Sequence, residues 1–595
     1  MTDYQAATSL PAMFFDQAAT LADKPFLWAR RGDGYHPLTW RQVETAVKDL
    51  ARGLRGLGLQ RGERVVLLAE NRPEWLIADL AIMAAGGITV PAYTTNTTSD
   101  HAHILADSGA RGVIVSTRAL AKTLIPAAMD ADDCRWIIGI EDLAQAQRGP
   151  VDFHRWQDVL ANGATMPDDV SDSVARIART DTACIIYTSG TGGAPKGVML
   201  SHGAIISNCM GAYVLLAQLG LGQDVFLSFL PLSHSYEHMA GQFFPISIGA
   251  EIYYATGIDK LTANLLEARP TIMTAVPRLY ETMYQRILRA VEKQGGTKKK
   301  LFDLALRLGR KRYLDPRSLT SWERILDLVV ERLVRNRMRE RFGGRLKVMV
   351  SGGAALNPDI GIFFTALGLR ILQGYGQTES APVIAFNPPN KMKIHTVGTP
   401  FEGVEVKIAE DGEILARGEL VMQGYWRNEE ATAEALKDGW LHTGDIGRID
   451  EDGYLQITDR KKDIIVLSGG DNVSPARIEG LLTLQPEIQM AMVHGDKRPH
   501  LVAILVPDDE FLRSFASQND KPADLAKLCT DPALHAALSG AVDRVNRDLS
   551  SFERIRRFTI ADSTFTIDNK MMTPSMKIRR HMIFEAHGKS LEELY

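Results

Sequence analysis

The chain has 595 residues, of which 45% are hydrophobic and 24% charged, and its 68 lysines and arginines against 72 aspartates and glutamates leave a net charge of -4. These proportions are typical of folded proteins and exclude disordered, collagen-like and coiled-coil chains. The near-neutral balance gives no overall support for nucleic-acid binding, which depends on a basic excess. At about 150 residues per domain, the length allows roughly four domains or fewer large ones.

Cysteine usage and the amino terminus indicate a reducing compartment. The four cysteines are far apart and show neither a Cys-x-x-Cys pair nor zinc-ribbon spacing, so we expect reduced thiols. The opening residues, MTDYQAATSLPAMFF, include an early aspartate and lack the basic run of a signal peptide. The longest apolar stretch, 80–93, contains two glycines and a proline and is shorter than the roughly 18 residues of a membrane span. We therefore expect a cytoplasmic protein.

Helix-like and strand-like segments alternate over the first 450 residues. Residues 39–57 carry apolar side chains at helical spacing, and the Thr-Trp-Arg-Gln at their start predicts a capping box. Residues 64–68 (RVVLL) and 112–116 (GVIVS) predict short buried strands, with a helix over 73–85 between them. We expect an α/β fold in which helices cover the sheets.

The segment 293–345 departs from the average composition. It holds 16 lysines and arginines against 6 aspartates and glutamates, a net charge of +10, so the rest of the chain carries -14. Its apolar residues recur at helical spacing and are flanked by basic ones: Leu301, Leu304, Leu308, Ile325, Leu328, Val329 and Leu333. Two interpretations stay open, a solvent-exposed helical hairpin or a surface that contacts anionic lipid or an acidic partner.

The pattern changes again near residue 460. The charged connector DRKKD (459–463) leads into a short strand, and Ser474 followed by Pro475 predicts the start of a helix. The apolar segments on either side of the turn GDKRPH predict a β-hairpin. We therefore expect a large body over 1–460 and a small α+β domain over 461–595.

The sequence YTSGTGGAPKG at 187–197 is the strongest candidate for a phosphate-binding loop. It follows a predicted strand over 183–186, its glycines let backbone N–H groups converge on a phosphate, and Lys196 adds a positive charge. It is not a Walker A loop, because Lys196 follows a proline, and it lacks the third glycine of dinucleotide-binding loops. A plain glycine-rich turn is the alternative.

The sequence HSYEH at 234–238 matches the H-x-x-E-H pattern of one class of zinc peptidases. That chemistry needs both histidines on one helix face, whereas Pro231 and the preceding VFLSFL place the motif at a strand end. No further acidic ligand is evident from the spacing. We expect either a structural histidine or one that faces the substrate, rather than a zinc ligand.

Five further motifs follow along the chain. They are VMVSGGAAL (348–356), QGYGQTES (373–380), GWLHTGD (439–445), TDRKKDIIVLSGGDNVSP (458–475) and TPSMKIRR (573–580). In this order, and together with the loop at 187–197, they resemble the motifs of the adenylate-forming enzymes, which include acyl-CoA synthetases, luciferases and the adenylation domains of peptide synthetases. The basic insertion, QGYGQTES and TPSMK in place of the commoner Gly-Lys make the chain most similar to the long-chain fatty acid:CoA ligases.

This resemblance implies a multi-sheet adenylate-forming body, a mobile C-terminal domain, and ATP, Mg²⁺ and coenzyme A. The implied phosphate contacts are Thr188, Ser189, Gly190, Thr191, Gly192, Gly193 and Lys196. The implied adenine contacts are Gly353, Ala354, Ala355 and Tyr375, with Gly374, Gly376 and Thr378 beside them. Asp445 and Arg460 would bind the ribose, Lys462 would be the hinge, and Gly469 lies in the turn beyond it. Lys577, His234 and Glu379 are the implied catalytic residues, and Glu379 with Thr191 would bind Mg²⁺. Gly192 departs from the family's usual threonine, which removes one hydroxyl but not the backbone cradle.

The implied reaction converts a fatty acid and ATP to an acyl-adenylate and pyrophosphate, and then transfers the acyl group to coenzyme A with release of AMP. The alternatives are transfer to a carrier protein, another class of carboxylic acid, and a zinc hydrolase or non-catalytic lipid-binding module. We expect fatty acid and coenzyme A as partners and no nucleic acid. Peripheral contact with the inner face of the membrane through 293–345, and a homodimer, are left open.

Overall fold

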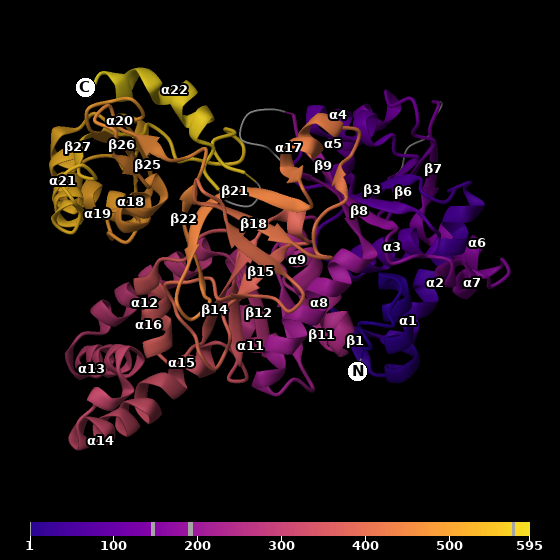
Figure 1. The fold of residues 1–595 in the computed structure, drawn as a ribbon, viewed down its shortest axis with the longest axis horizontal. Helices are drawn as coiled ribbons and strands as arrows, with labels where there is room; N and C mark the ends of the chain where they lie inside the picture. Colours follow the sequence, from indigo (N-terminus) through magenta and orange to yellow (C-terminus); the bar gives the residue numbers. More distant parts are fainter. Residues whose placement is uncertain (1, 144–148, 189–193, 574–576) are drawn as a thin grey trace.

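The computed structural model describes residues 2–143, 149–188, 194–573 and 577–595. In these residues the strands form sheets of nine, eight, five, three and two strands, with helices packed between and around them (Figure 1). The predicted α/β class, with a large multi-sheet body and a smaller α+β C-terminal part, is confirmed. None of the helices in the described ranges combines the length and apolar character that crossing a membrane needs.

The nine-stranded sheet is parallel in its centre. In spatial order its strands are β16 (Thr399–Pro400), β15 (Val383–Phe386), β14 (Ile371–Gly376), β13 (Val348–Ser351), β12 (Ile272–Ala275), β10 (Val225–Ser228), β11 (Glu251–Tyr254), β1 (Pro25–Arg31) and β2 (Gly34–Thr39). The strands from β14 to β1 run parallel, and antiparallel strands extend both edges. Because parallel strands end at the same edge of a sheet, the segments that follow β10, β13 and β14 lie close together.

The eight-stranded sheet contains the predicted strands at 64–68, 112–116 and 183–186, which are confirmed. Its order is β19 (Gly424–Tyr425), β9 (Lys196–Ser201), β8 (Thr182–Thr188), β4 (Ile88–Pro91), β3 (Arg64–Leu68), β5 (Gly112–Val115), β6 (Trp136–Gly139) and β7 (Asp152–Arg155). β8 and β9 are antiparallel, and Thr188 is paired with Lys196. The two ends of the predicted phosphate loop therefore lie side by side.

Two almost fully buried helices join the large sheets into one core. α3 (Pro73–Ala84) and α8 (His202–Leu216) share a hydrophobic cluster with strands of both sheets. A helix that is apolar nearly all round has no stable place except inside such a core. The helix predicted over 39–57 is α2 (Trp40–Gly56), and its capping box between Thr39 and Gln42 is confirmed.

The remaining sheets lie toward the C-terminus. The five-stranded sheet contains β17 (Glu405–Ile408), β18 (Glu413–Arg417), β20 (Leu436–Lys437), β21 (Trp440–Ile449) and β22 (Leu455–Arg460), and beyond it come β23 (Ile465–Val466), β24 (Asn472–Val473), β25 (Ile488–His494), β26 (Leu501–Pro507) and β27 (Ile555–Ile560). β25 and β26 form the predicted hairpin. Ser474 caps a helix with Pro475 at its first position, as the sequence predicts.

Other helices cover the sheets and build the C-terminal part. They are α1 (Leu10–Leu21), α4 (Thr98–Ser108), α5 (Arg118–Met129), α6 (Trp156–Ala164), α7 (Val170–Ala175), α9 (Ser235–Glu237), α10 (Phe244–Ile248), α11 (Leu261–Ala268), α16 (Pro358–Ala366), α17 (Glu429–Ala435), α18 (Pro475–Leu482), α19 (Asp509–Gln518), α20 (Leu525–Leu528), α21 (Pro532–Arg547) and α22 (Arg580–Glu592). The basic segment follows α12 (Pro277–Gln294) and consists of α13 (Gly296–Leu314), α14 (Ser321–Val330), the π-helical turn η5 (Glu331–Arg335) and α15 (Asn336–Arg341). Figure 1 shows α13 and α14 as a hairpin at one end of the molecule, which confirms the predicted helical hairpin.

Candidate active site

The sequence motifs converge at the carboxyl edge of the nine-stranded sheet. The segment after β10 carries HSYEH, and β13 and β14 lie within VMVSGGAAL and QGYGQTES. The hydroxyl oxygens of Ser235 and Thr378 are 3.1 Å apart, and the Tyr236 hydroxyl donates a hydrogen bond of 2.9 Å to the carbonyl oxygen of Val350. Residues from three motifs are thus in direct contact.

His234 lies at the start of α9 rather than at a strand end, so that sequence-based placement is wrong. β10 stops at Ser228, and His234 is the N-cap residue, with its Nδ1 accepting a hydrogen bond of 3.2 Å from the backbone N–H of Tyr236. Burial, and next the charge of Lys577, lowers the pKa of His234 to about 4. The imidazole is therefore neutral near pH 7 and carries its proton on Nε2.

The other members of HSYEH are used inside the protein. His238 Nε2 is 2.8 Å from a carboxylate oxygen of Asp79, and both side chains are buried. Glu237 accepts hydrogen bonds from Ser228 at 2.7 Å and Thr274 at 2.6 Å, and burial raises its pKa to about 7. In the part of the chain that the structure describes, no three His, Cys, Asp or Glu side chains are grouped to hold a metal ion. The zinc-peptidase alternative therefore has no ligand set.

Glu379 is connected to the end of the phosphate loop through Tyr425. The Tyr425 hydroxyl donates a hydrogen bond of 2.8 Å to Glu379 Oε1, and Lys196 Nζ lies 5.1 Å from the centroid of the same ring. Tyr425 is on β19, which pairs with β9. Sequence reasoning missed Tyr425, because the tripeptide Gly-Tyr-Trp does not by itself indicate a functional residue. The pairing of β19 with β9 alone brings it to this position.

Asp445 forms a second polar cluster, on β21. One of its oxygens accepts a hydrogen bond of 2.7 Å from the Tyr375 hydroxyl, and the other is 3.3 Å from Nε of Arg460, its partner on β22. Burial raises the pKa of Asp445, and Arg460 acts in the opposite direction. Gly374 precedes Tyr375 on β14. A carboxylate held in this way can accept hydrogen bonds from neighbouring hydroxyl groups.

A shallow surface of small residues follows β13. Ala354 and Ala355 are exposed, and Gly353 has a φ of +81°, which favours glycine. At Gly376 a Cβ atom would lie 1.8 Å from the carbonyl oxygen of Pro382, so only glycine fits beside the neighbouring chain. Small residues therefore lie at the end of β13, near Tyr375 of β14.

Lys577 comes from the far end of the chain and lies in this site. Burial and next the charge of Arg460 lower its pKa to about 8, while Asp445 and Glu379 act in the opposite direction. Its charge also lowers the pKa of His234. The charge of Lys577 therefore interacts with those of Glu379, Asp445 and Arg460 and with the imidazole of His234.

Some of the predicted residues are not part of this cluster. Lys462 is exposed in a turn in which the N–H of Asp463 donates a hydrogen bond of 2.9 Å to the carbonyl oxygen of Arg460. Gly469 lies in the exposed turn between β23 and β24, with no hydrogen bond to the site within the described ranges. Ser189, Gly190, Thr191, Gly192 and Gly193 lie outside the described residues.

Two family models match the chain over most of its length. The AMP-binding enzyme family matches residues 14–426, and the AMP-binding enzyme C-terminal domain matches residues 462–595. The chain belongs to the AMP-binding enzyme family. Relatives within it include a long-chain-fatty-acid–CoA ligase of Mycobacterium tuberculosis, FadD15, 35% identical over 96% of this chain and 94% of its own. The peroxisomal long chain acyl-CoA synthetase 7 of Arabidopsis thaliana is 32% identical over 100% of this chain and 87% of its own.

Solved structures of AMP-binding enzymes share the fold. The A-PCP didomain of the carboxylic acid reductase of Segniliparus rugosus, in complex with AMP, gives a TM-score of 0.78 at 20% identity over 99% of this chain and 82% of that one. The anthranilate CoA ligase AuaEII, in complex with anthranoyl-AMP, gives 0.74 at 22% identity over 99% of both chains. At these identities the similarity concerns the fold of the whole chain.

The chemistry of the site fits Mg²⁺, which AMP-binding enzymes use with ATP. Within the described ranges, Glu379 Oε2 accepts no hydrogen bond, while Oε1 is held by Tyr425. Mg²⁺ prefers oxygen ligands and commonly takes one or two from carboxylates and others from substrate phosphates and water. A single oriented carboxylate near Lys196, at the end of the phosphate loop, is consistent with that pattern.

Proposed function

We propose that this protein activates long-chain fatty acids. It joins the acid to ATP as an acyl-adenylate with release of pyrophosphate, and then transfers the acyl group to coenzyme A with release of AMP. The observation that carries this proposal is the 35% identity, over 96% of this chain, to a long-chain-fatty-acid–CoA ligase. The charge interactions of Lys577 with His234, Glu379 and Asp445 support it. Transfer to a carrier protein and other classes of acid are not favoured, because the curated relatives are named as fatty acid CoA ligases and long chain acyl-CoA synthetases.

The first half-reaction brings two anions together, because the fatty acid carboxylate attacks the α-phosphorus of ATP. Cations that stabilise the developing charge therefore lower the barrier. In this proposal Lys577 lies between the carboxylate and the α-phosphate, and Lys196 binds the leaving pyrophosphate. Glu379, with Thr191, would hold Mg²⁺, which supplies further charge neutralisation at the phosphates. No general base is needed, since a carboxylate is already ionised near pH 7.

The remaining residues orient the substrates. His234, neutral and protonated on Nε2, would donate a hydrogen bond to the acyl carboxylate without adding a charge. Asp445 and Arg460 would bind the ribose hydroxyls. The adenine would lie on the surface of small residues after β13 and beside β14. Its proposed contacts are Gly353, Ala354, Ala355, Gly374, Tyr375, Gly376 and Thr378.

An apolar cavity next to His234 supports a fatty acid as the substrate. Its enclosed volume is only about 30 Å³, and nearly all its lining side chains are apolar. Tyr236 and Met239, which follow His234 in the chain, both line it, together with Ala240, Phe226, Val350 and Phe401. This volume is about that of one water molecule, so an acyl chain with its carboxylate at His234 would have to displace these apolar side chains to enter this space, where its hydrocarbon is removed from water.

The proposal is tested by AMP release from ATP with acids of increasing chain length, with and without coenzyme A. We expect turnover to require coenzyme A and to rise from short to long acids, because each buried methylene contributes about 0.8 kcal/mol to binding. Turnover with carrier protein but not with coenzyme A would contradict the proposal. A preference for acetate or an aromatic acid would contradict the long-chain assignment.

The lowered pKa of Lys577 predicts a pH dependence for adenylation alone. Lys577 is cationic below its pKa of about 8 and loses its charge above it, so kcat/KM for pyrophosphate exchange should fall from about pH 8 upward. His234, with a pKa of about 4, adds no change between pH 6 and 8. Lys577→Arg should be slower but should lose this alkaline decline, because guanidinium stays protonated. A decline near pH 8 that persists in Lys577→Arg would show that another group titrates.

We further propose that 1–460 and 461–595 act as two domains joined at Lys462, so that the second half-reaction can exchange Lys577 for the Gly469 turn. In support, two hydrophobic clusters of the C-terminal part contain, among the described residues, no residue from before Ile465.

We also propose that the protein is cytoplasmic and contacts the inner face of the membrane peripherally through 293–345. We propose in addition that it forms a homodimer. The free cysteines Cys134, Cys184, Cys209 and Cys529 are consistent with that location.

A further inference from the structure

An exposed apolar stripe runs along α14 and into the turn that follows it. Trp322 is 67% exposed, Ile325 52% and Leu328 73%. Within the described ranges, six of the twelve large hydrophobic side chains that are exposed lie between residues 314 and 333: Leu314, Trp322, Ile325, Leu328, Val329 and Leu333. Single exposed apolar residues are common, but such a concentration marks an interaction surface.

The opposite face of α14 is already packed. Val330 is buried with Ala305 and Leu308 of α13, and Leu326 packs against the same cluster. α14 is therefore apolar on two faces, of which α13 covers only one. Trp322, Ile325 and Val329, at spacings of three and four residues, lie on the uncovered face.

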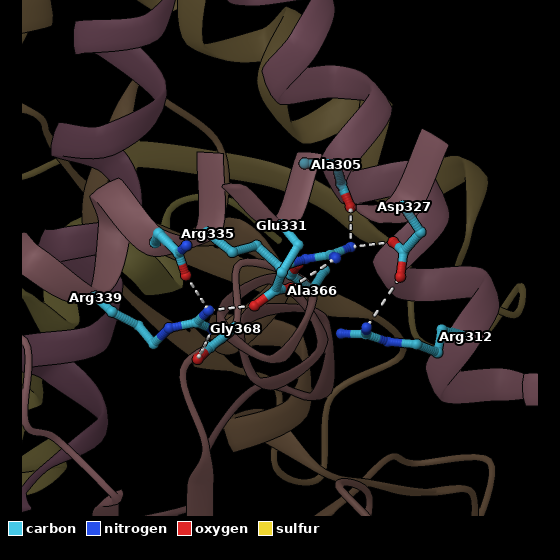
Figure 2. A network of polar contacts seen from close by, with 9 residues as sticks. Ala305, Arg312, Asp327, Glu331, Arg335, Arg339, Ala366 and Gly368 are labelled. Atoms are coloured by element: carbon cyan, nitrogen blue, oxygen red, sulfur yellow. Dashed lines mark hydrogen bonds and ion pairs between the residues drawn. The ribbon is translucent and has the colours of Figure 1, made fainter. Parts of the chain in front are cut away.

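A buried ionic network holds the hairpin in place, as Figure 2 shows. Arg335 is fully buried and donates hydrogen bonds to the carbonyl oxygens of Ala366 and Ala305, at 2.8 and 3.4 Å, and to Asp327 at 2.7 Å. Its other contact is Glu331, at 3.1 Å. Because these bonds join α13, α14 and the end of α16, the apolar stripe is presented by a fixed element and not by a loose loop.

The same network removes negative charge from the exposed face. The carboxylates of Glu323, Asp327 and Glu331 are each paired with lysine or arginine inside the hairpin. By contrast, the exposed side chains of Arg317, Arg324 and Arg332 form no ion pair with the described residues. The surface around the stripe is therefore positively charged, within a segment of net charge +10 in a chain of net charge -4.

We propose that α14 docks on the surface of an anionic lipid bilayer, parallel to the membrane plane. Trp322, Ile325 and Leu328 would enter the boundary between headgroups and acyl chains, and Arg324 and Arg332 would contact the anionic headgroups. Tryptophan is well suited to this boundary because its ring is apolar and its N–H is polar. A second copy of the chain is a poorer occupant, since it would bring two basic faces together. This inference rests on, and specifies, the peripheral membrane contact of 293–345 proposed above, and it does not depend on the reaction assigned to the active site.

The test is flotation of the full-length protein with phosphatidylcholine vesicles, with or without phosphatidylglycerol. We expect binding only to the anionic vesicles, weakening as salt is raised. The double variant Trp322→Ser with Leu328→Ser should lower partitioning at least about tenfold. Leu266→Ser, at an apolar residue of α11 that is 53% exposed, is the matched control and should bind as the wild type does. AMP release by each variant shows that it is folded.

The charge contribution is tested separately. Arg324→Gln and Arg332→Gln should each lower partitioning about fivefold, since one arginine near an anionic surface contributes about that factor. The exposed Arg513 of α19 provides the control Arg513→Gln, which should have no effect. Brominated lipids should quench tryptophan fluorescence in the wild type and much less in Trp322→Phe. Equal binding to neutral vesicles, no binding at all, or a dimer that dissociates in the double variant without vesicle binding would each overturn the proposal.

Discussion

Replacing Lys577 with alanine is expected to slow acyl-adenylate formation about 10²–10³-fold, a loss of roughly 2.7–4 kcal/mol of transition-state stabilisation. The physical reason is that, in the proposed reaction, Lys577 is the cation between the attacking carboxylate and the α-phosphate. Without it, the repulsion between two anions is less well compensated. Pyrophosphate exchange with a long-chain acid, in the absence of coenzyme A, measures this step.

Measuring the second half-reaction distinguishes a role of Lys577 in adenylation from a general structural effect of the substitution. Lys577→Ala should form the thioester from supplied acyl-adenylate at close to the normal rate, because the lysine is not needed after adenylation. Lys589→Ala, at an exposed lysine of α22, is the matched control and should leave both steps unchanged. Equal loss of both half-reactions in Lys577→Ala would contradict the proposal that this lysine leaves the site between them.

Replacing Lys462 with proline is expected to spare adenylation and to slow thioester formation about 10²-fold, the cost of misplacing a reacting group by about 1 Å. In this structure Lys577 is buried and its charge interacts with those of Asp445 and Glu379, as the proposal expects of the arrangement for adenylation. Proline fixes φ and would restrict the rotation at the hinge that the second step requires. The backbone N–H of Lys462 donates no hydrogen bond to the described residues, so the change removes none there.

The contacts between the two parts include polar side-chain contacts. Arg289 of α12 pairs with Asp508 and Glu510, each at 2.7 Å, and Arg278 donates a hydrogen bond of 2.9 Å to the carbonyl oxygen of Gln489. Polar contacts of this kind are typical of domains that separate and meet again. Lys462→Ala is the control, because it removes the same side chain and keeps the backbone free. Normal thioester formation in Lys462→Pro, or equal loss in Lys462→Ala, would remove the hinge assignment.

Local sequence patterns predicted individual elements well. The capping box at Thr39 and the buried strand at 64–68 depend on residues within one turn or one strand, and the structure confirms both. The start of α9 at His234 was not predicted, because a three-residue helix continued by a π-helical turn leaves no clear periodicity. Tyr425 was missed because its contact with Glu379 depends on strand pairing across the sheet and not on its neighbours.

By itself, the sequence determined the α/β class, the order of the motifs and the chemical groups at the site, because side-chain periodicity and short motifs are properties of adjacent residues. Only the tertiary structure decided which of those groups meet, since parallel strands that end at one edge bring together residues far apart in the chain. Burial likewise decided that His234 is neutral and that the pKa of Lys577 is about 8. The near-neutral net charge is an average over a chain that contains a basic hairpin. In this hairpin Glu323, Asp327 and Glu331 are paired with lysine or arginine, and the apolar stripe faces out. That division depends on which face of α14 packs against α13, and spacing along the chain does not specify it.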